Sequence, residues 1–445
     1  MRHVCLGLLA SLTIAAAEPS FHRDIRPILQ KNCAGCHQPA AKASDLDLTT
    51  YAGFKAGGKR GAAFQAGNAA ESLTLKYVTG AMKPPMPLGQ PPLPAGDIDL
   101  LKAWIIAGAK DDTPAVEESN QPTVYTQPPV VTAIRFSPNG EMLAISGNRE
   151  VLLHKADGSA LLKRLPGKAE RLLSIAWSTD SKMLIAGGGT PARFGEVQWW
   201  DVASGKQLHR AELTNDTVFG ASLAPDSSKV AVGCTDNTVH AFDTATGNEL
   251  YKLGNHEGWV LGTVFDVSGK RLVSVSRDRA AKLIDAKAGQ FLENVNQMKT
   301  ELNAVARHPK QDIIAVGGED RYAYVYKLDR PRNLKVGDDA TFVRRLERQD
   351  GPVLAIDWSP DAKRIAVAGS SPSVNLYDGD TGERLAACSG HAAGIYAVAF
   401  SPDGARLATG GFDGQIRLYN AADCKLIKAF IPVPLTNTTS AGGAQ

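Results

Sequence analysis

A turn-like tetrapeptide recurs through residues 129–435 and divides this region into similar units. The copies start at Ser137, Ser178, Ala224, Asp266, His308, Ser359 and Ser401, and the best preserved are SPNG, SPDA and SPDG. An alternating stretch such as IYAVAF precedes each copy, and a short apolar stretch such as RLATGG follows it. A third strand-like stretch such as VHAFD, a turn such as ATGN and a fourth stretch complete the unit. The starts lie 41 to 51 residues apart.

Four short strands in about 42 residues is the period of a β-propeller blade. Alternating apolar residues give each strand a face that must be covered by a neighbouring unit. No such unit can bury both faces alone, so the set must stack and close. The seven copies therefore predict an all-β, seven-bladed propeller over residues 129–435.

The last repeat carries the most specific motifs. Gly390-His391 precedes the tetrapeptide, and TGGFDG and then IRLYN follow it. With these motifs the region resembles the WD-repeat family. The resemblance implies a hydrogen-bonded structural network within a blade. Its members would be His391, Thr409, Asp413 and Tyr419 in the last repeat, and His256, Ser274 and Asp278 in the fourth, where Ile284 replaces the aromatic residue.

The first residues, MRHVCLGLLASLTIAAAEPS, indicate export. Arg2 gives a positive start, an apolar stretch follows, and Ala15-Ala16-Ala17 offers small residues for cleavage. This pattern is typical of a secretory signal peptide and is short for a membrane span. We expect residues 1–17 to be a signal peptide and the mature chain to have no transmembrane segment. The mature protein would be periplasmic or at the cell surface.

Residues 18–110 show helical patterning at both ends, in DIRPILQKNC and DIDLLKAWIIAG. This predicts a small all-α domain. Residues 111–128 are polar and contain Pro114, Pro122 and Pro128, so we expect an extended, exposed linker. Residues 436–445 are expected to be a flexible tail. The chain is thus predicted to be multidomain.

The stretch Cys33-Ala34-Gly35-Cys36-His37 is a chemical motif within the helical domain. Two thiols at this spacing can add to the two vinyl groups of haem, and the adjacent imidazole can bind the iron, so C-x-x-C-H indicates c-type haem attachment. A zinc site would need further ligands at suitable spacing, and no second C-x-x-C exists. A redox dithiol would need a strand–helix unit, which this region does not suggest.

The second axial ligand should be a thioether or an imidazole. The stretch AMKPPMPLGQPPL supplies two methionines after His37. A proline-rich loop can hold a sulfur atom with little loss of entropy. Met86 is the first choice as distal ligand of the haem iron, and Met82 is the alternative.

Residues 19–110 also resemble the planctomycete-type cytochrome c domain, through DIRPIL, CAGCH, GFKAGGKRGAAFQAGNAAESL, PPMPLG and DIDLLKAWIIAGA. The resemblance implies one covalent haem c on Cys33 and Cys36, with His37 as proximal ligand and a methionine as distal ligand. The usual motif has two prolines after the methionine. Here Met86-Pro87-Leu88 follows Pro84-Pro85 instead.

Charge is nearly balanced, with 49 Lys and Arg against 46 Asp and Glu, which disfavours nucleic acid as a partner. Six cysteines are too few for a disulfide framework. Three of them, Cys234, Cys388 and Cys424, are expected to be buried or inert thiols.

We therefore expect an exported mono-haem protein that transfers one electron to a redox partner. The propeller face would bind a further, unidentified protein. We expect an electron-transfer or binding protein rather than an enzyme. The alternatives are a haem-dependent oxidoreductase with a catalytic site on the propeller, and a surface scaffold without redox activity.

Overall fold

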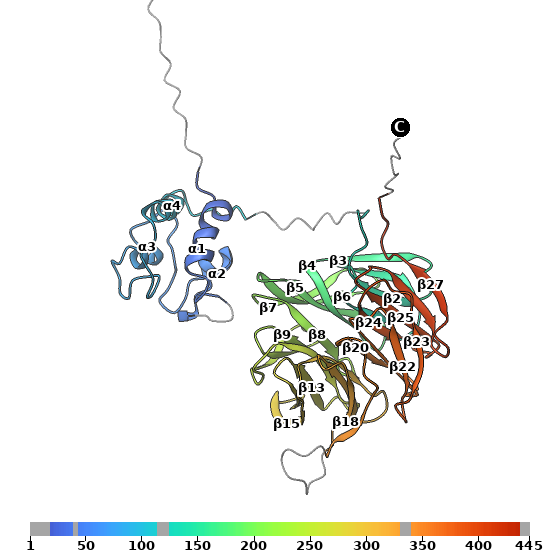
Figure 1. Ribbon diagram of the computed structural model, residues 1–445. Coiled ribbons are helices and arrows are strands. Elements are labelled where there is room, and N and C mark those ends of the chain that lie inside the picture. The colour runs from blue at the N-terminus through green and yellow to red at the C-terminus, as the bar shows by residue number, and fades with distance from the viewer. Residues whose placement is uncertain (1–17, 39–42, 114–123, 330–339, 437–445) are drawn as a thin grey trace, which may run out of the picture. The chain divides into compact units, whose positions relative to one another are not determined.

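The computed structural model describes residues 18–38, 43–113, 124–329 and 340–436. The chain divides into two compact units, Met1–Glu117 and Glu118–Gln445, and the division falls within the predicted linker (Figure 1). The predicted signal peptide and residues 437–445 of the predicted tail lie outside the described residues. The exact borders of the predicted segments stay predictions. Within the described ranges, no helix has the length and apolar character needed to cross a membrane.

The N-terminal unit is built from short helices. They are a π-helical turn η1 (Phe21–Ile25), α1 (Arg26–Asn32), a 3-10 turn η2 (Ala43–Asp45), α2 (Tyr51–Ala56), α3 (Leu73–Val78) and α4 (Ala95–Ile106). Side-chain oxygens cap two of their starts, because Ser20 accepts from the Arg23 N–H and Thr50 accepts from the Gly53 N–H. Gly108, at φ 96°, follows the end of α4 in a conformation that favours glycine.

An aromatic cluster forms the core of this unit. Trp104 on α4 is 1% exposed and packs against Phe21, Phe54 and Phe64, with ring centroids 5.5, 5.9 and 5.1 Å away. Its indole N–H donates to the Lys110 carbonyl at 3.1 Å. The predicted early and late helices therefore meet, because η1 and α4 share this core.

The second unit consists of β-strands. They are β1 (Ile134–Phe136), β2 (Met142–Ser146), β3 (Asn148–Lys155), β4 (Leu161–Trp177), β5 (Met183–Thr190), β6 (Phe194–Asp201), β7 (Gln207–Thr214), β8 (Val218–Leu223), β9 (Lys229–Cys234), β10 (Val239–Asp243), β11 (Glu249–Leu253), β12 (Val260–Phe265), β13 (Arg271–Ser276), β14 (Ala280–Asp285), β15 (Gln290–Gln297), β16 (Leu302–Arg307), β17 (Ile313–Gly318), β18 (Ala323–Lys327), β19 (Phe342–Arg345), β20 (Val353–Trp358), β21 (Arg364–Gly369), β22 (Val374–Asp378), β23 (Arg384–Cys388), β24 (Ile395–Phe400), β25 (Arg406–Gly411), β26 (Ile416–Asn420) and β27 (Leu426–Phe430).

These strands form antiparallel sheets, each made from strands that are consecutive in the sequence. Five sheets have four strands, and one has seven, in the order β1 to β7. In the seven-stranded sheet, the first part of β4 pairs with β3 and its second part pairs with β5. One long strand therefore connects two four-stranded halves.

Neighbouring sheets contact one another through their first strands. The contacts run from β4 to β8, β12, β16, β20 and β24, and then from β24 to β1 and from β1 to β4. A cavity of about 460 Å³ is lined by residues of β1, β4, β8, β12, β16, β20 and β24. Figure 1 shows the sheets following one another around this unit. Middle strands such as β9 and β21 are buried on both faces, as stacking requires.

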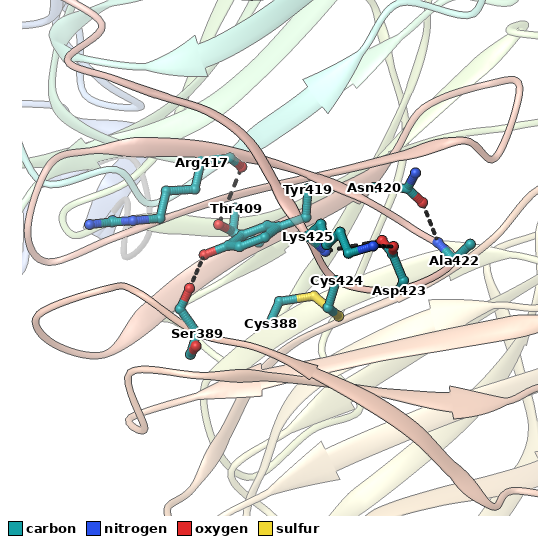
Figure 2. Close-up of a disulfide and its surroundings, with 10 residues drawn as sticks. All are labelled: Cys388, Ser389, Thr409, Arg417, Tyr419, Asn420, Ala422, Asp423, Cys424 and Lys425. Atoms are coloured by element: carbon teal, nitrogen blue, oxygen red, sulfur yellow. Dashed lines mark hydrogen bonds and ion pairs between the residues drawn. A yellow bond between two sulfur atoms is a disulfide. The ribbon is translucent and has the colours of Figure 1, made fainter.

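The histidine networks implied by the family resemblance are present in two sheets. Nε2 of His391 lies 2.7 Å from Oγ1 of Thr409, and its Nδ1 lies 3.0 Å from Oδ2 of Asp413. Arg417 donates to the same carboxylate at 2.8 Å. Tyr419 instead donates to the Ser389 carbonyl at 2.8 Å (Figure 2).

In the other sheet, Nε2 of His256 lies 2.7 Å from Oγ of Ser274, and its Nδ1 lies 2.7 Å from Oδ2 of Asp278. Burial alone would raise the pKa of Asp278, but hydrogen bonds from His256 and the backbone outweigh burial and lower that pKa to about 2. Both networks join the segment before a sheet to its second strand and the turn after it.

A disulfide joins Cys388, the last residue of β23, to Cys424 in the turn after β26 (Figure 2). The expectation of inert thiols at these two positions is wrong. The two residues are 36 positions apart in the sequence. Only the stacking of two successive sheets brings them together, so the bond links one sheet covalently to the next.

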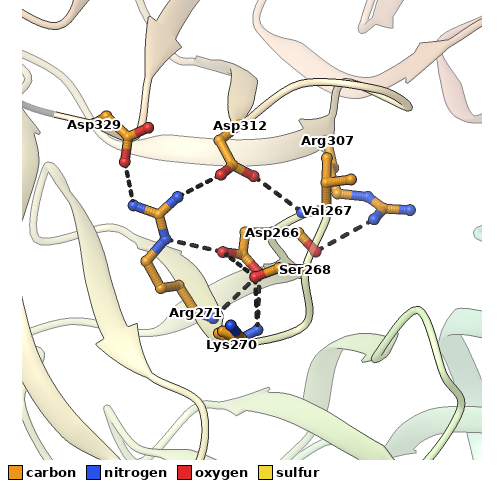
Figure 3. Close-up of polar contacts among 8 residues, drawn as sticks. All are labelled: Asp266, Val267, Ser268, Lys270, Arg271, Arg307, Asp312 and Asp329. Atoms are coloured by element: carbon orange, nitrogen blue, oxygen red, sulfur yellow. Dashed lines mark hydrogen bonds and ion pairs between the residues drawn. The ribbon is translucent and has the colours of Figure 1, made fainter.

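A salt-bridge cluster also crosses between sheets. Arg271 contacts Asp266 at 2.9 Å on its own sheet, and Asp312 and Asp329 at 2.6 Å on the following one (Figure 3). The Asp266 side chain is 1% exposed. Burial alone would raise its pKa, but hydrogen bonds from Arg271 and the backbone hold that pKa below its usual range.

The end of the predicted linker packs against the β-rich unit. Tyr125 is buried, and its backbone N–H donates to the Pro434 carbonyl at 2.8 Å. It also forms a parallel bridge with Leu435. This differs from the expected exposure of the whole linker, because Tyr125 has an apolar ring to bury and Glu150 accepts from its hydroxyl group.

We predict that replacing both disulfide cysteines, Cys388→Ser with Cys424→Ser, lowers the free energy of unfolding of the β-rich unit by about 3–4 kcal/mol. Opening a loop of this length gives entropy back to the unfolded chain. Thermal unfolding with and without dithiothreitol measures the effect. Reductant should destabilise the parent and leave the double variant unchanged; an equal response of both proteins would show that the disulfide does not form.

We predict that Arg271→Met lowers the free energy of unfolding by about 2 kcal/mol at pH 7, because it leaves the buried Asp266 carboxylate without its cation. The lowered pKa of Asp266 stabilises the fold above pH ~4, and this contribution is lost as the pH falls through the folded-state pKa. The variant should therefore lose stability at a higher pH than the parent. Calorimetry at several pH values tests this.

Arg384→Met is the matched control for this prediction. Arg384 pairs with Glu347 at 3.6 Å, and both side chains are about half exposed, so its loss should change stability by less than about 0.5 kcal/mol. Equal effects of the two substitutions would contradict the prediction.

Candidate haem-attachment site

Helix α1 ends at the C-x-x-C-H motif. Cys33 caps the helix, with its N–H donating to the Leu29 carbonyl at 2.8 Å. The N–H groups of Cys36 and His37 both donate to the Cys33 carbonyl, at 3.2 and 3.0 Å. This tight turn after the helix gathers the two thiols and the imidazole within five residues of chain.

The segment after residue 42 holds this turn in place. The N–H of Ala43 donates to the Cys36 carbonyl at 3.1 Å, and that of Leu48 donates to the His37 carbonyl at 2.9 Å. Nδ1 of His37 lies 2.9 Å from the Ala43 carbonyl oxygen. A carbonyl acceptor at Nδ1 fixes that nitrogen as the protonated one and leaves the Nε2 lone pair free for a metal, as is usual for a ligating histidine.

The two thiols have different surroundings. Cys33 is half-buried and packs against the aromatic core, whereas Cys36 is exposed. Burial raises the pKa of the Cys33 thiol to about 11. Neither cysteine is in a disulfide. One thiol therefore faces the apolar interior and the other faces solvent, which suits a ligand that is apolar at its centre and accessible at one edge.

The two candidate distal methionines lie in the loop after α3. The Met82 N–H donates to the Lys76 carbonyl at 2.9 Å, and the Met86 N–H donates to the Tyr77 carbonyl at 3.1 Å. Both side chains are partly exposed. The packed core of the unit, as far as it is described, includes Cys33 but neither methionine. The loop is thus anchored through its backbone, and both thioethers remain available.

The residues present fit haem c. A turn carries two unpaired thiols and an imidazole oriented through Nδ1, and two anchored methionines can supply a thioether. The structure brings Cys33, Cys36 and His37 together. It leaves the choice between Met86 and Met82 open, because both are held in the same way.

Comparison with known families agrees with this division of the chain. The family model described as Planctomycete cytochrome C matches residues 33–87, from the first cysteine of the motif to the residue after Met86. The model described as WD domain, G-beta repeat matches residues 247–285 and 382–420. A third, described as Anaphase-promoting complex subunit 4 WD40 domain, matches residues 305–396.

Several curated proteins are similar to parts of the chain. Transcription factor unc-37 of Caenorhabditis elegans is 26% identical over 44% of this chain and 31% of its own length. Autophagy-related protein 16 of Arabidopsis thaliana is 22% identical over 53% of each chain. WD repeat-containing protein 26 homolog, also of Arabidopsis thaliana, is 24% identical over 59% of this chain and 43% of its own length.

The chain spans about a third to a half of the length of these relatives. The helical unit and the β-rich unit match different families, in keeping with their different secondary structure. The protein therefore joins an N-terminal segment of the planctomycete cytochrome c type to a region of WD repeats.

Proposed function

We propose that this protein is an exported mono-haem cytochrome that transfers single electrons, with its β-rich unit serving as a platform for another protein. The observation that carries the proposal is the turn after α1, where two free thiols accompany an imidazole held through Nδ1 by the Ala43 carbonyl. The family match over residues 33–87 supports it.

Each residue of the site has a distinct role in this proposal. Cys33 and Cys36 would form the thioether bonds, His37 would bind the iron through Nε2, and Met86 would supply a thioether ligand, with Met82 as the alternative. Bound haem would supply one-electron chemistry through its ferrous and ferric states. The chain orients the imidazole of His37. It would place apolar side chains against the haem near Cys33 and leave the haem edge near Cys36 open to solvent. A thioether ligand favours the ferrous state and raises the reduction potential.

The β-rich unit forms, in this proposal, a closed propeller of seven blades. Its support is that β4 serves two four-stranded halves, that first strands contact one another in a continuous series, and that β24 contacts β1. The Arg135 guanidinium on β1 also donates to the Val398 carbonyl on β24, at 3.3 Å. WD repeats are commonly surfaces for protein binding, so a protein partner is the expected ligand of this unit.

Export is supported by chemistry as well as by the predicted signal peptide. Disulfides persist in oxidising compartments and are rare in reducing ones. The bond between Cys388 and Cys424 therefore fits a periplasmic or cell-surface location.

We predict that Cys33→Ser with Cys36→Ser abolishes covalent haem when the chain is produced in a host with a cytochrome c maturation system. Without thiols no bond to the vinyl groups can form. Intact-protein mass and haem staining of denaturing gels measure the loss. The thermal transition of the β-rich unit should remain, since these cysteines lie in the other unit. Haem staining of the double variant, or a parent mass equal to that of the bare processed chain, would refute the attachment.

We predict that Met86→Ala removes the long-wavelength charge-transfer band of methionine-bound ferric haem and lowers the reduction potential. Loss of the thioether removes the ligand that favours ferrous iron. Met82→Ala is the matched control, because it lies in the same loop with the same kind of backbone anchor, and it should leave both readouts unchanged. The opposite pattern would assign the ligand to Met82, and an unchanged band in both variants would rule out methionine ligation.

A further inference from the structure

A second group of metal-binding side chains lies in the β-rich unit, far from the haem motif in sequence. Cys234 ends β9, Asp236 lies in the following turn, and His240 is the second residue of β10. One ligand atom from each lies within 4.8 Å of the other two. Cys234 and His240 are buried, while the Asp236 side chain is 25% exposed. The cluster is thus enclosed on the strand side and open at the turn.

The antiparallel hairpin explains why these side chains meet. His240 lies directly opposite Val232 in the register of β9 and β10, so both side chains share one face of the sheet. Cys234 is two residues beyond Val232 and therefore points to the same face. The Cys234 N–H donates to the Thr238 carbonyl at 3.0 Å, which closes the turn that carries Asp236.

Comparison with two other sheets of the same chain shows what is unusual here. Asp278 and Asp413 occupy the turn position of Asp236, and Lys282 and Arg417 occupy the strand position of His240. In those sheets a cationic side chain approaches the turn aspartate, at 3.7 Å from Lys282 and 2.8 Å from Arg417. In the hairpin of β9 and β10, the equivalent position holds an imidazole.

In this sheet a cation reaches the turn aspartate from another strand. Lys252 on β11 pairs with Oδ2 of Asp236 at 3.0 Å, and its side chain is 41% exposed. Oδ1 of Asp236 faces Thr238 instead.

The cluster contains more hydrogen-bond acceptors than donor hydrogens. Nδ1 of His240 lies 2.5 Å from a Glu249 carboxylate oxygen, which fixes the proton on Nδ1 and turns the Nε2 lone pair toward the cluster. The Thr238 hydroxyl contacts both Nε2 of His240, at 2.9 Å, and Oδ1 of Asp236. Its single proton can serve only one of these two acceptors.

We propose that Cys234, Asp236 and His240 bind a zinc ion. Sulfur, imidazole nitrogen and carboxylate oxygen are the ligands that Zn²⁺ prefers, and the Glu249–His240 pair is the carboxylate–histidine arrangement that orients a ligating imidazole. On binding, the Cys234 S–H bond breaks, its proton goes to solvent, and a sulfur–zinc bond forms without a change in oxidation state. The three ligand atoms must close to about 3.5 Å from one another, given zinc–ligand bonds of about 2.0–2.3 Å.

The site is independent of the proposed electron transfer. Its effect would be structural: the ion would tie the β9–β10 turn to the face of the sheet, as the cationic side chains do elsewhere, and would protect Cys234 from oxidation. Asp236 supplies its ligand from the solvent side, so the ion can enter there and a water molecule can take the fourth tetrahedral position.

The test uses the untagged full-length chain, stripped with EDTA, incubated with one equivalent of ZnSO₄ and dialysed. Elemental analysis should find about one zinc per chain in the parent, and also in the Cys33→Ser, Cys36→Ser background, which excludes binding by the haem motif. Cys234→Ser and His240→Gln should lose the zinc. His209→Gln is the matched control, because His209 lies on β7 of the neighbouring sheet, where its ring packs against Trp199 and its Nε2 contacts the Ala245 carbonyl; it should retain the ion.

Glu249→Gln keeps the test decisive if the buried substitutions do not fold. Its side chain is 45% exposed, so the variant should fold, and loss of the carboxylate behind His240 should weaken zinc binding about 10- to 100-fold in calorimetric titration. Zinc should also raise the melting temperature of the parent more than that of this variant. Absence of zinc from the parent, or equal affinity in the parent and Glu249→Gln, would overturn the proposal.

Discussion

The structure of the larger unit depends on the burial of both faces of every sheet. A four-stranded antiparallel sheet of this length cannot cover itself, so each one requires a neighbour on either side. The contacts from β4 through β24 and back to β1 meet that requirement. Because each sheet is formed by consecutive strands, the first and last sheets join through packing and side-chain hydrogen bonds, and through the bridge between Tyr125 and Leu435, rather than through a shared sheet.

The same backbone frame carries different polar groups in different sheets. Histidine networks hold the turns after β13 and β25, and a salt-bridge cluster around Arg271 holds the junction of two sheets. A disulfide joins β23 to the turn after β26. In the hairpin of β9 and β10, the corresponding positions bring together thiol, carboxylate and imidazole. Because packing between the sheets determines the fold, the polar residues at these positions can differ from sheet to sheet and form different kinds of link.

In the smaller unit, a small aromatic core positions the helices. Trp104 and its neighbours fix helix α4 against η1, and α1 then delivers the haem motif at its C-terminal end. The backbone bonds from Ala43 and Leu48 hold the motif in a turn that exposes one thiol and half-buries the other. The proposed electron transfer would need such a site to be rigid, because small movements of the ligands between oxidation states keep the reorganisation energy low.

The sequence alone determined the repeat period and the strand pattern, because these depend on residues at fixed local spacing. Its resemblance to the WD-repeat family implied the two histidine networks. The sequence also determined the C-x-x-C-H motif, whose members lie within five residues. It could not choose between Met86 and Met82, since both lie in one proline-rich loop. Pairing of Cys388 with Cys424, burial of Tyr125 and the shared face of Cys234 and His240 were decided only by tertiary structure. These features depend on which sheet stacks on which and on the register between strands, and neither is encoded at a single position.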